Sequence, residues 1–230
     1  MLKAFKIIVF LIFFIYPLSL NAHVQHYENL NKIEFDIYRN GKHIGAHVFS
    51  FSKTGDEIKV KSEINFEIKK LGIVLYEYQA EGTEIYKNGE LTQFNSKTNQ
   101  NGKNKYVNIK MLGNKKYKID GSSFKGETSS DYLIGTWWNH SIVEAKAQIS
   151  AVSGRIIMQK VNFLGKEKID INGKTYNTLH FNFSSTDKKL AKDKKLNTDV
   201  WYDEKTLNWV KASFKKKGKW EYRLKVIEQF

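Results

Sequence analysis

In residues 58–68, IKVKSEINFEI, polar side chains alternate with the apolar residues Ile58, Val60, Ile64, Phe66 and Ile68. In an extended chain successive side chains point to opposite faces, so this alternation is typical of a strand with one buried and one solvated face. The same period of two recurs along the chain, in residues 33–38, 107–111, 179–183 and 220–226. The pattern therefore predicts a protein built mainly from half-buried β-strands.

Turn signals separate these alternating segments. Five of them are pairs of Asn or Asp with Gly: Asn40-Gly41, Asn88-Gly89, Asn101-Gly102, Asp120-Gly121 and Asn172-Gly173. Such pairs tolerate the positive φ of a type I′ turn, the tight turn that joins antiparallel strands. Gly55-Asp56 and Gly113-Asn114 add two further turn candidates. We therefore expect an all-β fold: an antiparallel meander curved into an open or closed barrel-like sheet.

Two segments depart from the alternation. Residues 129–151 have a mixed period, and we expect at most one short helix there, near 137–151. Residues 184–197 are polar and rich in lysine, which is typical of a solvated loop.

The first residues have the three-part layout of a secretory signal peptide. Lys3 and Lys6 precede an apolar run over residues 7–20, and the small residue Ala22 follows. A transmembrane anchor is disfavoured because a span needs about 20 apolar residues, and Pro17 interrupts this run. We expect residues 1–22 to be cleaved near Ala22, with export to the periplasm of a Gram-negative-type bacterium. Residues 23–230 are then expected to form a single antiparallel β domain.

The composition limits the kinds of partner. The chain has no cysteine, which excludes disulfides, thiolate metal sites and a lipid anchor at the cleavage point. Its formal net charge is +14, carried almost wholly by lysine. Phosphate recognition favours the arginine fork, so we expect no nucleic-acid partner. An anionic membrane surface and the codon bias of an AT-rich genome are both open explanations of the charge.

Aromatic residues provide the candidate binding site. A curved sheet could enclose a cavity lined by Tyr and Trp, whose rings combine an apolar body with a polar group and suit an apolar or lipid-like small molecule. The alternative is ordinary core packing, because strands favour aromatic residues in any case. The candidate lining residues are Tyr76, Tyr78, Trp137, Trp138, Trp201, Tyr202 and Trp209.

Metal and catalytic sites are not expected. His43 and His47 are predicted to share a strand face about 13 Å apart, too far for one ion. His23, the N-terminal residue after cleavage, could offer its amine and imidazole to copper, but chain termini are usually disordered. Glu77, Glu81 and Glu84 lie close in sequence, yet no catalytic motif accompanies them. We therefore expect no enzyme activity and no cofactor.

Several short motifs resemble one bacterial family. The stretch 33–51, with Asn40-Gly41-Lys42-His43-Ile44-Gly45, is similar to its opening, and further matches follow in order along most of the chain. They include Tyr76-Glu77-Tyr78, Trp138-Asn139, Ser153-Gly154-Arg155 and Asp199-Val200-Trp201-Tyr202-Asp203 with Trp209. The family is catalogued as domain of unknown function 6134. The resemblance implies an exported β-protein with no established activity, and it assigns no functional residues.

The leading hypothesis is a non-catalytic binding or carrier module for an apolar or lipid-like ligand. Two alternatives remain open. The first is an integral outer-membrane barrel, because Tyr222, Leu224 and Val226 precede a terminal Phe230 at strand period, although Glu228 lies on the Phe230 face. The second is an envelope structural or interaction protein without a small-molecule ligand.

Overall fold

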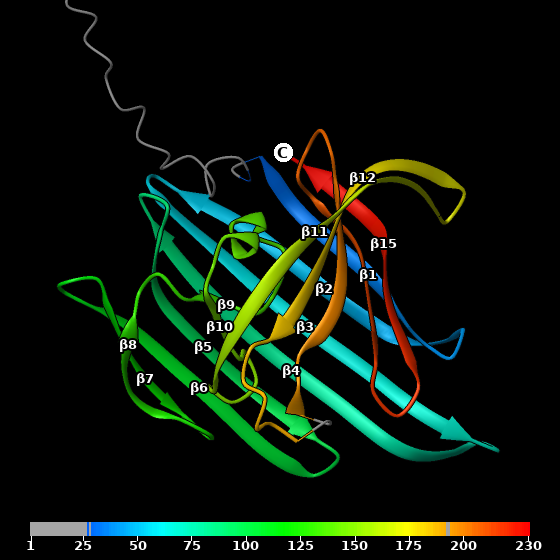
Figure 1. The fold of residues 1–230 in the computed structure, drawn as a ribbon, viewed down its shortest axis with the longest axis horizontal. Helices are drawn as coiled ribbons and strands as arrows, with labels where there is room; N and C mark the ends of the chain where they lie inside the picture. Colours follow the sequence, from blue (N-terminus) through cyan, green and yellow to red (C-terminus); the bar gives the residue numbers. More distant parts are fainter. Residues whose placement is uncertain (1–26, 28, 192–193) are drawn as a thin grey trace, which may run out of the picture.

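A computed structural model describes residues 27, 29–191 and 194–230, arranged as one 15-stranded sheet (Figure 1). The predicted signal peptide, residues 1–22, and His23 lie outside the described residues. The strands are β1 (Leu30–Arg39), β2 (Lys42–Thr54), β3 (Glu57–Lys70), β4 (Ile73–Lys87), β5 (Glu90–Gln100), β6 (Lys103–Leu112), β7 (Lys116–Gly121), β8 (Lys125–Ser129), β9 (Leu133–Ile134), β10 (Ala147–Ile149), β11 (Ile156–Ile171), β12 (Lys174–Ser185), β13 (Asn197–Asp203), β14 (Trp209–Lys215) and β15 (Lys219–Gln229).

The strand order follows the chain closely. The sheet runs from β8 down to β1, continues from β1 to β15, and then descends to β9, so the first and last strands pair side by side. Strands β8 and β9 are the two edges, which makes the sheet an open, barrel-like structure. All pairs are antiparallel except the short parallel contact of β9 with β10. The predicted all-β meander is confirmed.

Four of the predicted hairpin turns have the expected geometry. Asn40, Asn88, Asn101 and Asn172 have φ of 50°, 51°, 52° and 52°, and the glycines that follow have φ between 79° and 83°. The Asp120-Gly121 turn is not formed, because both residues belong to β7 and the chain reverses one residue later. Gly121 instead allows a close backbone contact: a Cβ there would lie 2.7 Å from the Ser153 carbonyl oxygen.

A β-bulge overturns the predicted arrangement of two histidines. Ile37 pairs with Gly45 and Tyr38 pairs with His43, so Ile44 is an extra residue on β2. An extra residue reverses the face on which the following side chains lie. His47 therefore points inward and is 5% exposed, whereas His43 lies on the outer face, 3.3 Å from Asp36.

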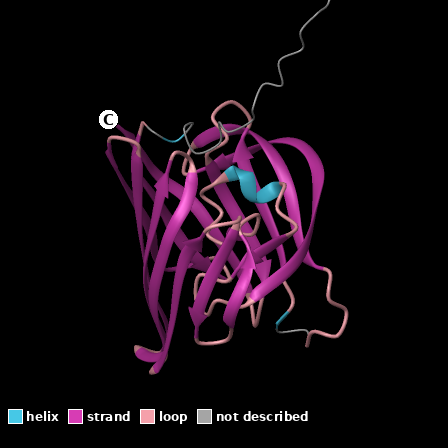
Figure 2. Ribbon diagram, turned by 90° about the vertical axis from the view of Figure 1, so that its left-hand side faces the viewer, coloured by secondary structure: helices cyan, strands magenta, loops and turns pink. Residues whose placement is uncertain are grey.

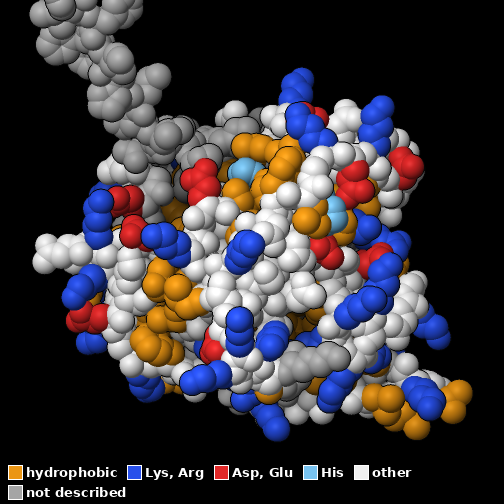
Figure 3. Space-filling model, in the orientation of Figure 1, with side chains coloured by type: hydrophobic (Ala, Val, Ile, Leu, Met, Phe, Trp, Pro, Cys, Tyr) orange, Lys and Arg blue, Asp and Glu red, His pale blue; other side chains and the backbone are white. Residues whose placement is uncertain are grey.

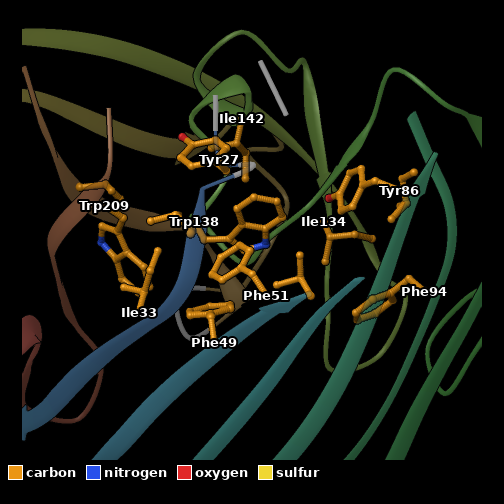
Figure 4. Close-up of a cluster of buried hydrophobic side chains, with 14 of the residues drawn as sticks. Tyr27, Ile33, Phe49, Phe51, Tyr86, Phe94, Ile134, Trp138, Ile142 and Trp209 are labelled. Carbon is orange, nitrogen blue, oxygen red and sulfur yellow. The ribbon is translucent and has the colours of Figure 1, made fainter. Parts of the chain in front are cut away.

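The core fills the concave face of the sheet (Figure 4). Its main cluster surrounds Trp138, whose ring lies against those of Tyr27, Phe51 and Tyr86 at centroid distances of 5.3, 5.3 and 5.7 Å. A second, smaller cluster contains Ile37, Phe66 and Tyr78. Tyr222 packs against both clusters and joins them.

The connection over residues 130–154, here called the inner segment, lies inside the curved sheet (Figure 2). The predicted short helix is a 3-10 helix, His140–Val143, capped by the Asn139 side chain, which accepts a hydrogen bond from the Ser141 N–H. Ser96 Oγ donates to the Ala151 carbonyl at 2.5 Å, and the Ser123 N–H donates to that of Ser153 at 2.9 Å. These bonds tie the inner segment to β5 and to the β7–β8 turn.

Candidate functional site

Glu84 on β4 is a buried polar group with three hydrogen-bond donors around it. Its carboxyl is 2% exposed and accepts hydrogen bonds from the Tyr86 hydroxyl at 2.5 Å, the Trp138 indole at 2.9 Å and the Thr136 hydroxyl at 3.1 Å. Burial raises the pKa of Glu84, and the three hydrogen bonds oppose that rise. Two of the donors belong to the inner segment, so Glu84 fastens this segment to the sheet. Donors of the protein occupy both carboxylate oxygens, which suits a structural role better than proton transfer to a substrate.

A second buried polar group of the interior, His47, is surrounded by aromatic rings rather than by hydrogen-bond donors. His47 of β2 lies among aromatic rings: its centroid is 4.1 Å from Phe49, 6.0 Å from Tyr222 and 6.2 Å from Trp209. Trp137 of the inner segment completes the group, at 5.6 Å from Trp209 and 6.3 Å from Tyr222. We call His47, Trp137, Trp209 and Tyr222 the His47 cluster.

Polar atoms of the His47 cluster lack hydrogen-bond partners. Within the described part of the chain, neither ring nitrogen of His47 has a partner, and the indole N–H groups of Trp137 and Trp209 have none either. A buried polar atom without a partner costs about 1–3 kcal/mol, so folded proteins rarely leave one, and here several occur together. Burial lowers the pKa of His47 to about 3, so the ring is neutral at physiological pH. The cluster thus offers three N–H donors and one imidazole acceptor.

The backbone of Trp137, a member of this cluster, has a strained conformation. Its φ is 61°, a left-handed conformation that a bulky residue rarely adopts. The Tyr202 hydroxyl donates to the Trp137 carbonyl at 3.0 Å and holds the backbone in place. Strain of this kind persists only where the surroundings impose it, and it is concentrated at functional sites.

Toward the β3–β4 turn the side chains of the interior become less completely buried. Phe66 stacks on Tyr78 with centroids 4.8 Å apart and on Tyr76 with centroids 6.1 Å apart. Ile68, the strand partner of Tyr76 next to the turn, is only half-buried. On the other side of Phe66, farther from the turn, Ile64, Ala80 and Lys105 are half-buried as well. Half-buried side chains on an inner face indicate that this end of the interior is open to solvent.

The structure brings together some of the predicted lining residues and separates others. Trp137 and Trp209 belong to the His47 cluster, Trp138 packs directly behind it against Glu84, and Tyr202 holds Trp137. Tyr76 and Tyr78 lie in the second cluster, toward the open end.

Trp201 does not line the interior. It lies on the outer face, where its ring stacks on His180 at 4.1 Å, its indole donates to Glu167, and the ammonium of Lys211 lies 4.7 Å from the ring centroid. Its neighbours Val200 and Tyr202 are fully buried on the opposite face of β13. Strand alternation explains this separation, because adjacent residues of a strand cannot both face the interior.

Sequence reasoning did not identify His47 and Tyr222 as parts of this site. The sequence places Tyr222 in an alternating strand, and the spacing of His47 from His43 serves only to exclude a shared metal ion. The signal that could have identified His47 is its position two residues before the apolar Phe49-Ser50-Phe51 alternation. That position predicts an inward-facing imidazole once the strand is continued through His47.

Other chemistry is poorly supported in the described residues. Glu77 and Glu81 are exposed, away from the interior that holds Glu84. No group of three or more His, Cys, Asp or Glu side chains in the described ranges is placed to hold a metal ion. A polar hollow of about 640 Å³ lies over β3–β6 and includes outer-face residues such as Glu63, Glu81 and Lys97. The described part of the chain also contains no helix with the length and apolar character that crossing a bilayer requires.

A known protein family matches most of the chain. The model of the family described as domain of unknown function DUF6134 matches residues 35–225. The chain belongs to this family. The match spans the strands from β1 to β15, including the His47 cluster, and confirms the resemblance seen in the sequence motifs. The chain matches no curated protein.

The chain was also compared in three dimensions with solved structures. A β-barrel-like protein of the DUF1849 family, from Brucella abortus, superposes with a TM-score of 0.62 at 10% identity, covering 88% of this chain and 98% of that protein. A Bacteroides fragilis protein described as a predicted exported protein with a YmcC-like fold has a TM-score of 0.38 at 8% identity, covering 87% of this chain and 99% of its own. The first similarity establishes that this DUF6134 member has a β-barrel-like fold.

Proposed function

We propose that this DUF6134 member is an exported, non-catalytic carrier that holds an apolar or lipid-like ligand inside its curved sheet. The observation that carries the proposal is the His47 cluster, in which buried indole and imidazole groups lack hydrogen-bond partners among the described residues. A ligand that supplies these partners would remove the cost of burying them. The layout of residues 1–22 supports export.

The cluster defines the chemistry of the ligand. Three N–H donors and one acceptor within an aromatic wall suit a carbonyl or carboxyl group attached to an apolar chain or ring. A cationic head group is disfavoured, because the neutral imidazole and the indoles offer it no negative charge. The apolar part of the ligand would lie along Tyr78 and Tyr76 toward the open end of the interior.

The polarity of the two sheet faces favours a carrier over an integral outer-membrane barrel. The inner face holds the fully buried aromatic residues, whereas the outer-facing residues of β3 include Lys59, Lys61 and Glu63. A barrel embedded in lipid has the reverse arrangement, with an apolar outer face. A purely structural role would not explain why the His47 cluster buries polar groups that have no partner among the described residues.

Native mass spectrometry of the protein purified without delipidation tests the proposal. We expect a bound small-molecule mass that is lost after extraction with organic solvent. His47→Phe keeps the aromatic volume but removes the imidazole donor and acceptor, so we expect about ten-fold weaker ligand retention. His43→Phe is the matched control, because it is the same change on the outer face of the same strand, and it should retain the ligand.

Two results would contradict the carrier function. One is the absence of any bound molecule in the undelipidated wild-type protein. The other is equal ligand content in His47→Phe and His43→Phe, which would show that the His47 cluster does not contact the ligand.

A further inference from the structure

The turn between β3 and β4 differs chemically from the four Asn-Gly turns. Leu71 and Gly72 have φ of 52° and 81°, the same geometry as the four Asn-Gly turns described above. In those turns Asn accepts the left-handed conformation readily, whereas in this turn the residue is Leu. The Leu71 side chain is 93% exposed, so packing within the protein does not explain the choice.

Leu71 is part of a continuous apolar tip. Ile73, Val74 and Leu75 follow it and are 66%, 45% and 56% exposed. In Figure 1 this hairpin projects at the lower right beyond the neighbouring strands, and Figure 3 shows hydrophobic side chains gathered at the same place. Exposed apolar residues that cluster in this way mark a contact surface.

The strand register places several other loops at the same end of the sheet. Gly45, near the β1–β2 turn, pairs with Phe66 of β3, and Arg39 pairs with Trp220, near the β14–β15 turn. Tyr78 of β4 pairs with Gln100, at the β5–β6 turn. The loop after β12 lies here too, because Thr198 pairs with Phe214 near the end of β14. We call this end of the sheet the basic end.

Positive charge is in excess at the basic end. Exposed lysines occur on every loop that meets there, among them Lys42, Lys103, Lys188, Lys189, Lys215 and Lys216. The acidic residues near these loops include Glu67, Glu77, Asp187 and Glu221. Glu67 already pairs with Lys69, and Glu221 with Lys219. An apolar tip within a lysine-rich surface matches the layers of an anionic bilayer, whose negative head groups lie above an apolar interior.

From this match we infer that the basic end is a membrane-docking surface: the Leu71–Leu75 tip enters the head-group and acyl boundary of an anionic lipid bilayer, while the surrounding lysines contact the head groups. The half-buried residues Ile68 and Tyr76 lie at this end as well, next to the tip. Docking therefore brings the open end of the interior next to the lipid. The inference rests on the exposed surface alone and stands whether or not the interior holds a ligand.

Sedimentation with lipid vesicles tests the inference. We expect the purified protein to bind vesicles of equal parts phosphatidylcholine and phosphatidylglycerol, and to bind phosphatidylcholine alone much more weakly. The double variant Leu71→Asn and Ile73→Thr should bind the anionic vesicles about ten-fold or more weakly, because the insertable apolar surface is lost. Lys215→Gln with Lys216→Gln should reduce the preference for phosphatidylglycerol and flatten the salt dependence.

Two controls separate docking from a folding defect. Leu71→Asn introduces at this turn the Asn-Gly pair that the four other turns contain, so the melting temperature should stay equal or rise. Leu164→Asn removes another exposed leucine, on β11 and 55% exposed, and it should bind vesicles like the wild type. Equal binding by the tip variant and the wild type, or no vesicle binding by the wild type, would overturn the inference. Self-association that the tip variant loses, without vesicle binding, would also overturn it and assign the tip to a second copy of the chain.

Discussion

At the residue scale, His47 and Glu84 show how two buried titratable groups on the same inner face differ. Three side-chain donors surround Glu84, and burial raises its pKa. Among the described residues His47 has no hydrogen-bond partner, and burial lowers its pKa to about 3. One group therefore binds the inner segment to the sheet, and the other is the group to which the proposed ligand would bind.

The lowered pKa of His47 predicts a specific loss of stability in acid. Between its ordinary pKa of 6.5 and about 3, the unfolded chain binds a proton that the folded chain does not, so stability falls as the pH falls. In ligand-free protein, the stability of His47→Phe relative to the wild type should rise by about 1.4 kcal/mol per pH unit below 6.5. Urea unfolding of both proteins across this pH range measures the difference. A difference that does not change with pH would show that His47 is not buried as a neutral ring.

At the element scale, the inner segment depends on a close backbone contact with β7. A Cβ on Gly121 would lie 2.7 Å from the Ser153 oxygen and 3.1 Å from the Gly154 Cα, and neither backbone atom can rotate away. The contact matters because Ala151 and Ser153 anchor one end of the segment that carries Trp137 and Trp138. Docking of this segment is therefore a condition for forming the His47 cluster.

Gly121→Ala should consequently destabilise the protein by about 1–3 kcal/mol, as overpacking does in well-filled interiors. Gly113→Ala is the control, since a Cβ there has nothing within 4 Å, and it should leave stability unchanged or slightly raised. Chemical denaturation of the two variants measures the contrast. Similar midpoints for both would mean that the inner segment is not held tightly against β7.

At the scale of the whole molecule, the meander brings the loops of many strands to one end, where they combine positive charge with the apolar β3–β4 tip. The charge is spread over several loops, whereas one hairpin supplies the apolar tip. The curvature of the sheet gathers them at one end, as the proposed carrier would need if it exchanged its proposed ligand with a bilayer.

Fractionation of cells should reflect this arrangement. We expect part of the protein to sediment with membranes at low salt and to be released by high salt, because mobile ions screen contacts between exposed lysines and lipid head groups. An integral barrel would stay in the membrane pellet under the same wash. The Leu71→Asn and Ile73→Thr variant should shift toward the soluble fraction already at low salt.

The sequence by itself determined the fold class, the approximate strand positions and four of the hairpin turns. Alternation with a period of two and the φ preference of Asn-Gly are local properties, and they can be seen over a few residues. The family also followed from short local motifs, and the match over residues 35–225 confirms it.

Only the tertiary structure decided which side chains meet. One bulge at Ile44 separates His47 from His43, and strand alternation sends Trp201 outward while Tyr202 faces inward. The position of Trp137 depends on how residues 130–154 pack against strands β4, β5 and β7, which lie far away in sequence. Strand register and long-range packing determine these positions. Neither can be predicted from the pattern of a few neighbouring residues.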